Sequence, residues 1–235
     1  MIFAASDLHG FPLVRFRNGL QAIGFGEDDF LYILGDVADR HGDGGAAMFR
    51  WLTVQRNVQL LMGNHEQMML SCAEMLYDAS PACVKRLSRE ELQVFLHWSD
   101  NGGTATLNGF AALRQTDPES IPRILNYVSR APYYAVTRAG GREFLLTHAG
   151  LGNFAPDKPI QEYTAEELLW NRPSPEDEYF DDVMTVFGHT PTILYGPEYA
   201  GKIMRTRTWC NIDVNTRTHD RIAVLRLDDM KEFYI

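Results

Sequence analysis

The chain has 235 residues, of which 45% are hydrophobic and 23% charged, and its formal net charge is −9. This length and composition suit one α/β domain with a full core, whereas the acidic balance disfavours binding of a nucleic-acid backbone. The sequence has no run of about 18 apolar residues that could span a membrane, and its N-terminus lacks the regions of a signal peptide. Its three cysteines are widely spaced and predict neither a disulfide framework nor a thiolate zinc site. We expect a cytoplasmic protein with a single domain over residues 1–235 that binds neither nucleic acid nor membrane.

The first quarter of the chain alternates between short apolar runs and stretches of helical periodicity. Apolar runs at 2–5, 30–34 and 58–62 predict buried strands, and apolar residues recur at helical spacing over 11–23 and 46–55. This order predicts parallel β-α-β units with right-handed crossovers. The loops that follow such strands lie together at one edge of the sheet, where open α/β sheets bind ligands.

The pattern from about 66 to 132 is helical, and we expect a helical insert that packs on the α/β core. A capping box that begins at Ser88 predicts the start of one helix in this insert. Proline directly after Asp117 predicts that Asp117 is the N-cap of another.

Strands are predicted again in the second half of the chain. The segments 133–136 and 144–147 flank a glycine-rich turn, which is typical of a hairpin, and 183–187 is a further apolar run. Four short apolar segments between 193 and 225 predict a strand meander that closes the fold. The whole chain therefore predicts an α/β sandwich of two mixed β-sheets flanked by helices.

Five predicted strands end in side chains of the kinds that bind metal ions. These side chains are Asp7, His9, Asp36, Asn64, His65, His148 and His189. A lone histidine after a strand is more often structural, because imidazole finds many hydrogen-bond partners. Five such clusters favour a metal site, and histidine, carboxylate and amide ligands without thiolate suit Mn²⁺, Fe or Zn²⁺. Because Asp36 has two oxygens that can bind two ions, the sequence predicts a two-metal centre suited to phosphate-ester hydrolysis.

These residues also form motifs that resemble those of a known family. The motifs are Asp-Leu-His at 7–9, Gly-Asp-Val-Ala-Asp-Arg at 35–40, Gly-Asn-His-Glu at 63–66, and the histidines His148 and His189. They resemble the signature of the metallophosphoesterases, and more narrowly that of the phosphoprotein phosphatases. Residues 170–172 and 187–191 are similar to the short bacterial and phage lambda-type serine/threonine phosphatases.

The resemblance implies a sandwich fold of the metallophosphoesterase type with two metal ions that share Asp36. The ligands that it implies for the first ion are Asp7, His9 and Asp36. Those that it implies for the second ion are Asp36, Asn64, His148 and His189. The ions would be Mn²⁺, with Fe or Zn²⁺ as alternatives.

The resemblance also implies four catalytic residues. His65 would protonate the leaving alkoxide, a step that contributes about 10²–10⁴-fold. Asp39 would hydrogen-bond His65 and favour its protonated form. Arg40 and Arg172 would bind the non-bridging phosphate oxygens. Without the resemblance, Arg172 would be interpreted as a surface cation near a helix C-terminus.

The sequence departs from the family pattern at two places. His41 stands where the family usually has glycine, and residues 212–215 read Ile-Asp-Val-Asn where the lambda-type pattern ends in Thr-Gly. The related symmetrical diadenosine tetraphosphatases usually have alanine at the position of Asp39, so Asp39 favours the protein-phosphatase branch.

We therefore expect a serine/threonine phosphoprotein phosphatase that acts on a phosphorylated protein or peptide. One alternative is a hydrolase of the same fold that acts on diadenosine tetraphosphate, cyclic nucleotides or another small phosphoester. A second is a non-catalytic regulator that keeps the metals, although retention of His65 and Arg40 argues against it.

Overall fold

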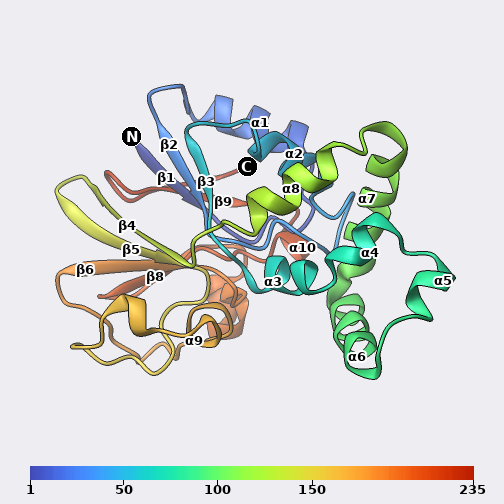
Figure 1. Ribbon diagram of the computed structural model, residues 1–235. Helices are drawn as coiled ribbons and strands as arrows, with labels where there is room; N and C mark the ends of the chain where they lie inside the picture. Colours follow the sequence, from blue (N-terminus) through green and yellow to red (C-terminus); the bar gives the residue numbers. More distant parts are fainter.

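Two five-stranded sheets pack face to face in this computed structural model (Figure 1), which describes residues 1–235 apart from the side chain of Arg217. The first sheet consists, in spatial order, of β10 (Lys231–Tyr234), β9 (Ala223–Arg226), β1 (Ile2–Ala5), β2 (Phe30–Ile33) and β3 (Val58–Leu60). The second consists of β4 (Tyr134–Ala139), β5 (Arg142–Thr147), β6 (Val183–Phe187), β8 (Trp209–Asn211) and β7 (Met204–Arg205). Both sheets mix parallel and antiparallel pairs, as the sequence predicts.

The parallel half of the first sheet is built from the predicted β-α-β units. Helix α1 (Leu13–Ala22) connects β1 to β2, and α2 (Ala46–Leu52) connects β2 to β3. Side chains alternate along β1, so Phe3 packs under the outer helices while Ala4 faces the second sheet. This alternation places one apolar layer between the sheets and another beneath the helices.

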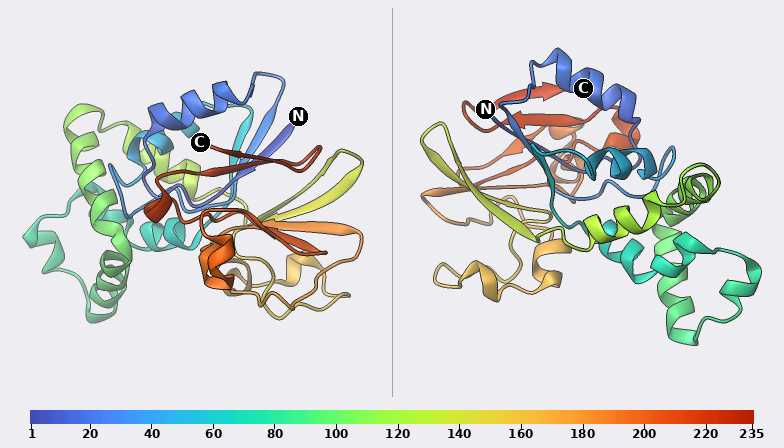
Figure 2. Two further views of the ribbon diagram at one scale, coloured as in Figure 1. Left: turned by 180° about the vertical axis from the view of Figure 1, so that it is seen from behind. Right: turned by 45° about the horizontal axis from the view of Figure 1, so that its top comes forward.

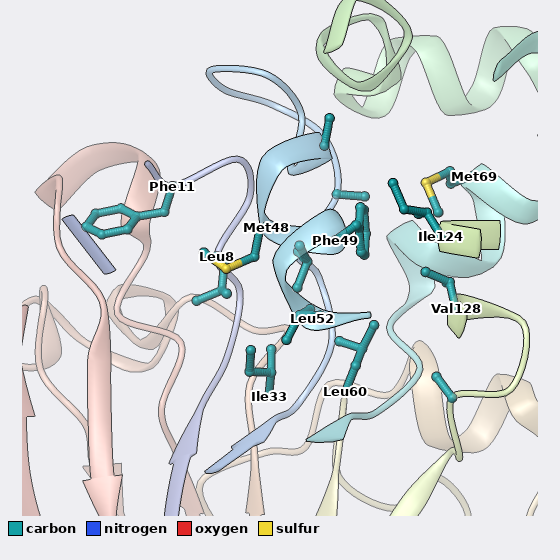
Figure 3. Close-up of a cluster of buried hydrophobic side chains, with 14 of the residues drawn as sticks. Leu8, Phe11, Ile33, Met48, Phe49, Leu52, Leu60, Met69, Ile124 and Val128 are labelled. Atoms are coloured by element: carbon teal, nitrogen blue, oxygen red, sulfur yellow. The ribbon is translucent and has the colours of Figure 1, made fainter. Parts of the chain in front are cut away.

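The helical insert forms a lobe beside the first sheet, and Figure 2 shows that its middle helices project away from both sheets. The chain enters the insert through α3 (Asn64–Ser71), whose first three residues belong to the motif after β3. The helices that follow are α4 (Ala73–Tyr77), α5 (Pro81–Val84), α6 (Arg89–Trp98), η1 (Ser99–Gly103), α7 (Thr104–Thr116) and α8 (Ser120–Val128). Figure 3 shows Ile33 and Leu60 of the sheet beneath Phe49 of α2, with Ile124 and Val128 of α8 beside them. The insert is thus joined to the core through a continuous apolar cluster.

Some local predictions hold and others are wrong. Ser88 caps α6 with the predicted box, since its hydroxyl accepts from Glu91 N at 3.2 Å. Asp117 ends α7 instead of starting α8, whose first residue is Ser120. The prediction failed because an Asp-Pro pair is also typical of a turn between helices.

The structure also corrects the predicted strand meander near the C-terminus. Residues Thr192–Tyr195 form a 3₁₀ turn, η3, between Pro191 and Gly196, because proline restricts the chain and cannot donate to a sheet. The last four strands divide between the sheets, β7 and β8 in the second and β9 and β10 in the first. A short helix, α9 (Ala165–Leu169), packs on the second sheet. No helix in the described part of the chain is both long and apolar enough to cross a membrane.

Candidate active site

The loops after β1 and β2 are joined at the edge where these strands end. The main-chain N–H of Asp7 donates to Gly35 O at 3.2 Å, and that of His9 donates to Asp36 O at 2.8 Å. Asp7, His9 and Asp36 have left-handed φ angles of 56°, 41° and 57°. Such angles are unfavourable for residues with a side chain and cluster at functional sites. Here they turn three potential ligands toward one point.

The first group of potential ligands contains His9, Asp36 and His65. One ligand atom from each lies within 4.8 Å of the others, and all three side chains are buried. His9 Nδ1 lies 3.0 Å from Ala38 O, so it must donate there, which leaves the Nε2 lone pair facing the group. Asp7 borders the group, with its Oδ1 3.9 Å from His9 Nε2.

The second group contains Asp36, His148 and His189, again with ligand atoms within 4.8 Å of one another. Asn64 lies among them, because its Oδ1 is 2.9 Å from His148 Nε2 and 3.1 Å from His189 Nδ1. Asp36 thus belongs to both groups. The structure brings together all six predicted metal ligands, which come from loops after five different strands.

The hydrogen bonds of His148 fit a bound cation. His148 Nδ1 is 2.7 Å from Leu34 O and must donate to it, and burial lowers the pKa of His148, which favours the neutral ring. The Nε2 lone pair of that ring then faces two further acceptors, Asn64 Oδ1 at 2.9 Å and Asp36 Oδ1 at 3.4 Å. A cation among these atoms, or a proton on Asp36, would relieve the repulsion between their lone pairs. His189 Nε2 is also buried without a hydrogen-bond partner in the described chain.

The buried carboxyl groups also favour positive charge at this site. Burial and the nearby Asp7 raise the pKa of Asp36 and that of Asp213 well above the ordinary value. A divalent cation would offset this repulsion and keep Asp36 ionised. Imidazole and carboxylate groups in these numbers match the ligand preferences of Mn²⁺, Fe and Zn²⁺.

Glu66 holds the loop after β2 in place. Its carboxylate accepts from the main-chain N–H groups of Asp36, Val37 and Ala38 at 2.7, 2.8 and 3.0 Å, and from that of Gly63 at 3.1 Å. Glu66 is fully buried, so its charge depends on these donors. Burial raises its pKa to about 7 although the donors oppose the shift.

His65 and Asp39 form a buried pair beside the first group. His65 Nδ1 is 2.7 Å from Asp39 Oδ2, and His65 Nε2 is 3.2 Å from a guanidinium nitrogen of Arg40. Because the guanidinium only donates, Nε2 accepts and Nδ1 donates to Asp39. Two residues of the insert complete the carboxylate's partners: Trp98 Nε1 donates to Oδ2 at 2.9 Å and Thr106 Oγ1 donates to Oδ1 at 2.6 Å.

The predicted hydrogen bond between Asp39 and His65 is present, but it does not make His65 more basic than usual. Burial is the larger cause, and with the charge of Arg40 it lowers the pKa of His65 well below its ordinary value. Burial raises the pKa of Asp39 to about 7, although Thr106 and Trp98 oppose this shift. Burial and the charge of Arg40 therefore favour the neutral form of His65 in this arrangement.

Arg40 and Arg172 border a cleft of about 190 Å³ that His9, His189 and Asp213 also line. Both guanidinium groups line this opening and can meet an incoming anion. Arg172 lies near His189, with its Nη1 3.5 Å from His189 O and 3.4 Å from Thr190 Oγ1. Arg172 is therefore part of this site and not an isolated surface cation.

Comparison with known proteins agrees with this geometry. Residues 1–220 match the family described as calcineurin-like phosphoesterase. The chain belongs to this family. Calcineurin-like phosphoesterases use dinuclear metal centres, and the two ligand groups around Asp36 are candidates for such a centre.

Two curated relatives of this phosphoesterase are both named bis(5'-nucleosyl)-tetraphosphatase, symmetrical. The protein from Acidovorax sp. (strain JS42) is 27% identical over 206 residues, which cover 85% of this chain and 60% of the relative. The protein from Acidovorax ebreus (strain TPSY) is 26% identical over the same shares. The chain therefore spans only 60% of the length of the relatives that it matches.

Two solved structures share the fold of this phosphoesterase. A putative diadenosine tetraphosphatase superposes with a TM-score of 0.62 at 16% identity, covering 100% of this chain and 92% of that one. A protein serine/threonine phosphatase from Saccharomyces cerevisiae gives a TM-score of 0.57 at 15% identity, covering 100% of this chain and 78% of that one. Identities this low support the fold alone.

Three residues that support the site were not predicted from the sequence. Glu66 lies inside the Gly-Asn-His-Glu motif, and a carboxylate at a helix start could have suggested that it binds main-chain N–H groups. Trp98 and Thr106 reach Asp39 from 59 and 67 residues away in sequence. No local pattern marks these two residues, because only the packing of the insert brings them to Asp39.

Proposed function

We propose that this phosphoesterase is a metal-dependent hydrolase whose first candidate substrate is a dinucleoside polyphosphate such as diadenosine tetraphosphate. The observation that carries the hydrolase assignment is the pair of ligand groups that share Asp36, bordered by two arginines that line the cleft. The dinucleotide is favoured because the matched curated relatives are symmetrical tetraphosphatases.

The residues of the site have distinct tasks in this proposal. Asp7, His9 and Asp36 would hold one ion, and His65 of the first group would serve as the acid instead of a ligand. The second group with Asn64 would hold the other ion. Two bound ions supply a nucleophile from water at neutral pH and neutralise phosphoryl oxygens. Arg40 and Arg172 would bind the outer oxygens of the phosphoryl group as planar forks.

Arg40 would also control the proton on His65. In the structure Arg40 donates to His65 Nε2, the atom that would have to carry the proton for the leaving group. An anionic phosphate oxygen competes for the same guanidinium. Once Arg40 turns to the phosphate, His65 Nε2 is free to take up a proton, and Asp39 stabilises the charged ring.

A phosphorylated protein or peptide is the second candidate substrate, and the pair of Asp39 and His65 favours it. Loss of the serine oxygen as an alkoxide requires a proton, so a positioned acid contributes much to that reaction. A nucleotide released from a phosphoanhydride ends in phosphate, whose second pKa is about 6, and leaves without that help. The pair of His65 and Asp39 would therefore accelerate hydrolysis of a phosphomonoester more than cleavage of a phosphoanhydride.

Side-by-side turnover tests both candidates. The Mn²⁺-loaded protein is given diadenosine tetraphosphate, with ADP measured, and a phosphoserine peptide, with phosphate measured. We expect faster turnover of the dinucleotide, and we expect His65→Asn to slow the peptide reaction far more than the dinucleotide reaction. Faster peptide turnover would replace the first candidate with the second. If the protein binds metal but hydrolyses neither substrate, the result would support the non-catalytic alternative.

A further inference from the structure

Trp170 differs from the other tryptophans of the chain in its surroundings. Its side chain is 38% exposed, whereas Trp98 and Trp209 are fully buried and Trp51 packs against Phe16. Trp170 belongs to none of the apolar clusters in the described part of the chain, so packing of the core does not account for it. Its position beside the candidate metal centre does suggest a task.

Three neighbours orient the indole ring of Trp170 between the insert and the metal centre. The ring lies edge to face with that of His189, with centroids 6.1 Å apart and 80° between the planes. Its centroid is 6.4 Å from that of His97 in α6, and its Nε1 donates to Gln67 Oε1 in α3 at 3.4 Å. These contacts orient the ring before a ligand arrives, which lowers the entropic cost of binding a flat group.

The cleft beside Trp170 combines cationic and apolar groups. His189 lines this cleft together with Arg40, Arg172 and Leu194, and Leu194 is 68% exposed. Trp170 precedes Arg172 by two residues, so their α-carbons are at most about 7 Å apart. Guanidinium groups bind phosphate oxygens as forks, and exposed aromatic rings stack on bases. A ligand that uses both surfaces has phosphate groups joined to a flat apolar group.

We propose that Trp170 forms a nucleobase subsite, in which one base of a dinucleoside polyphosphate stacks on the indole ring while a phosphoryl group lies in the cleft. The identity of this ligand rests on the proposed function. Each adenosine of diadenosine tetraphosphate is joined to the two central phosphates through one further phosphate. A central phosphate in the cleft therefore leaves the base outside it, at the rim where Trp170 lies. Phosphoserine carries no flat ring, so the subsite separates the two candidate substrates.

Two substitutions of Trp170 separate stacking from the hydrogen bond to Gln67. Leucine keeps an apolar side chain but cannot stack, whereas phenylalanine keeps a flat ring and loses the Nε1 donor. We expect Trp170→Leu to raise the KM for diadenosine tetraphosphate about tenfold or more, with a much smaller change in kcat, because stacking on an aromatic ring contributes roughly that much per base. Trp170→Phe should stay close to wild type.

Gln67→Leu is the matched control, because it removes the acceptor of Trp170 Nε1 and leaves the indole ring in place. If Trp170 acted only by joining the insert to α9, this control and Trp170→Phe would raise the KM as much as Trp170→Leu, and that result would overturn the proposal. Inorganic tetraphosphate, which has no base, supplies the matched substrate. Equal rises in KM for tetraphosphate and the dinucleotide in Trp170→Leu would also overturn it.

Binding of ADP without turnover separates this inference from the proposed function. ADP is the product of symmetrical cleavage, and pyrophosphate has the same two phosphates without the base. Calorimetric titration of the Mn²⁺-loaded protein, at fixed free Mn²⁺, should show that Trp170→Leu weakens ADP about tenfold and pyrophosphate much less. Equal binding of ADP by wild type and Trp170→Leu would overturn the subsite, even in a protein that hydrolyses the dinucleotide. The expected loss of ADP binding, in a protein that does not hydrolyse the dinucleotide, would contradict the proposed function and support the subsite.

Discussion

The strand-end loops and the helical insert both form the candidate active site, but they contribute in different ways. The loops supply the predicted metal ligands, directly after strands whose positions the two sheets fix. The insert supplies Trp98 and Thr106, which contact Asp39 and no predicted ligand. We therefore expect the loops to determine metal binding and the insert to determine how well the acid pair is held.

Removing the shared ligand should have the largest effect. Asp36→Asn takes one negative charge from both ligand groups, and metal ions contribute several kcal/mol of transition-state stabilisation. We expect kcat/KM to fall by on the order of a thousandfold or more and metal affinity to fall with it. Steady-state kinetics and calorimetric Mn²⁺ titration measure the two effects. Unchanged metal binding in this variant would place the metal ligands elsewhere.

Asp39→Asn should separate the acid pair from the metal centre. The neutral amide of this variant cannot stabilise a charged His65, so the rate with substrates that have a poor leaving group should fall by about 10²-fold. p-Nitrophenyl phosphate, whose leaving group needs no proton, should be hydrolysed nearly as fast as by wild type. Mn²⁺ stoichiometry should not change. Equal losses with both substrates would mean that Asp39 supports the whole site and not the acid alone.

The insert residues should produce a smaller effect, seen mainly in stability. Trp98→Phe removes one donor from the buried Asp39 carboxylate, and Thr106→Val removes another. Loss of a hydrogen bond to a buried charged group costs about 1–3 kcal/mol in the free energy of unfolding, measured by urea denaturation. Metal affinity should stay at the wild-type value, and a large loss of it would end the distinction between loops and insert.

The surface ion pair of Lys158 and Glu167 lies outside the strand-end loops and the insert. Its removal should have the smallest effect, a loss of stability that depends on pH. Lys158 and the N-cap residue Thr164 hydrogen-bond Glu167 and hold its pKa at about 2. The unfolded carboxyl group has a pKa of about 4.3, so it binds a proton before the folded one does as pH falls. The contribution of Glu167 to stability is therefore complete above about pH 4.3 and is lost toward pH 2. Glu167→Gln should flatten the stability curve in this window, measured by thermal unfolding, and leave activity unchanged.

Much of the fold was predictable because each local pattern agreed with the tertiary structure. β1, β2 and β3 are apolar runs of strand length separated by helical periodicity, and a parallel sheet follows from that order. The C-terminal strands could not be assigned to a sheet, because short apolar segments do not indicate which neighbour they pair with. Residues 193–195 are apolar like a strand, yet Pro191 and Gly196 set the backbone there.

The candidate site also has residues that the sequence could predict and residues that it could not. Asp7, Asp36, Asn64 and His148 could be found because a polar residue after a buried strand is conspicuous, and parallel strands bring such residues to one edge. The roles of these residues as ligands remain a prediction. Trp98 and Thr106 could not be found, because their hydrogen bonds to Asp39 depend on how the insert packs.

Calorimetric titration of the metal-free protein with Mn²⁺ tests the central claim most directly. Two ligand groups that share Asp36 predict two ions bound per chain, with Asp36→Asn weakening both. Folded wild-type protein that binds no Mn²⁺, Fe²⁺ or Zn²⁺, or that binds one ion unaffected by Asp36→Asn, would contradict the dinuclear site on which the proposed hydrolysis depends.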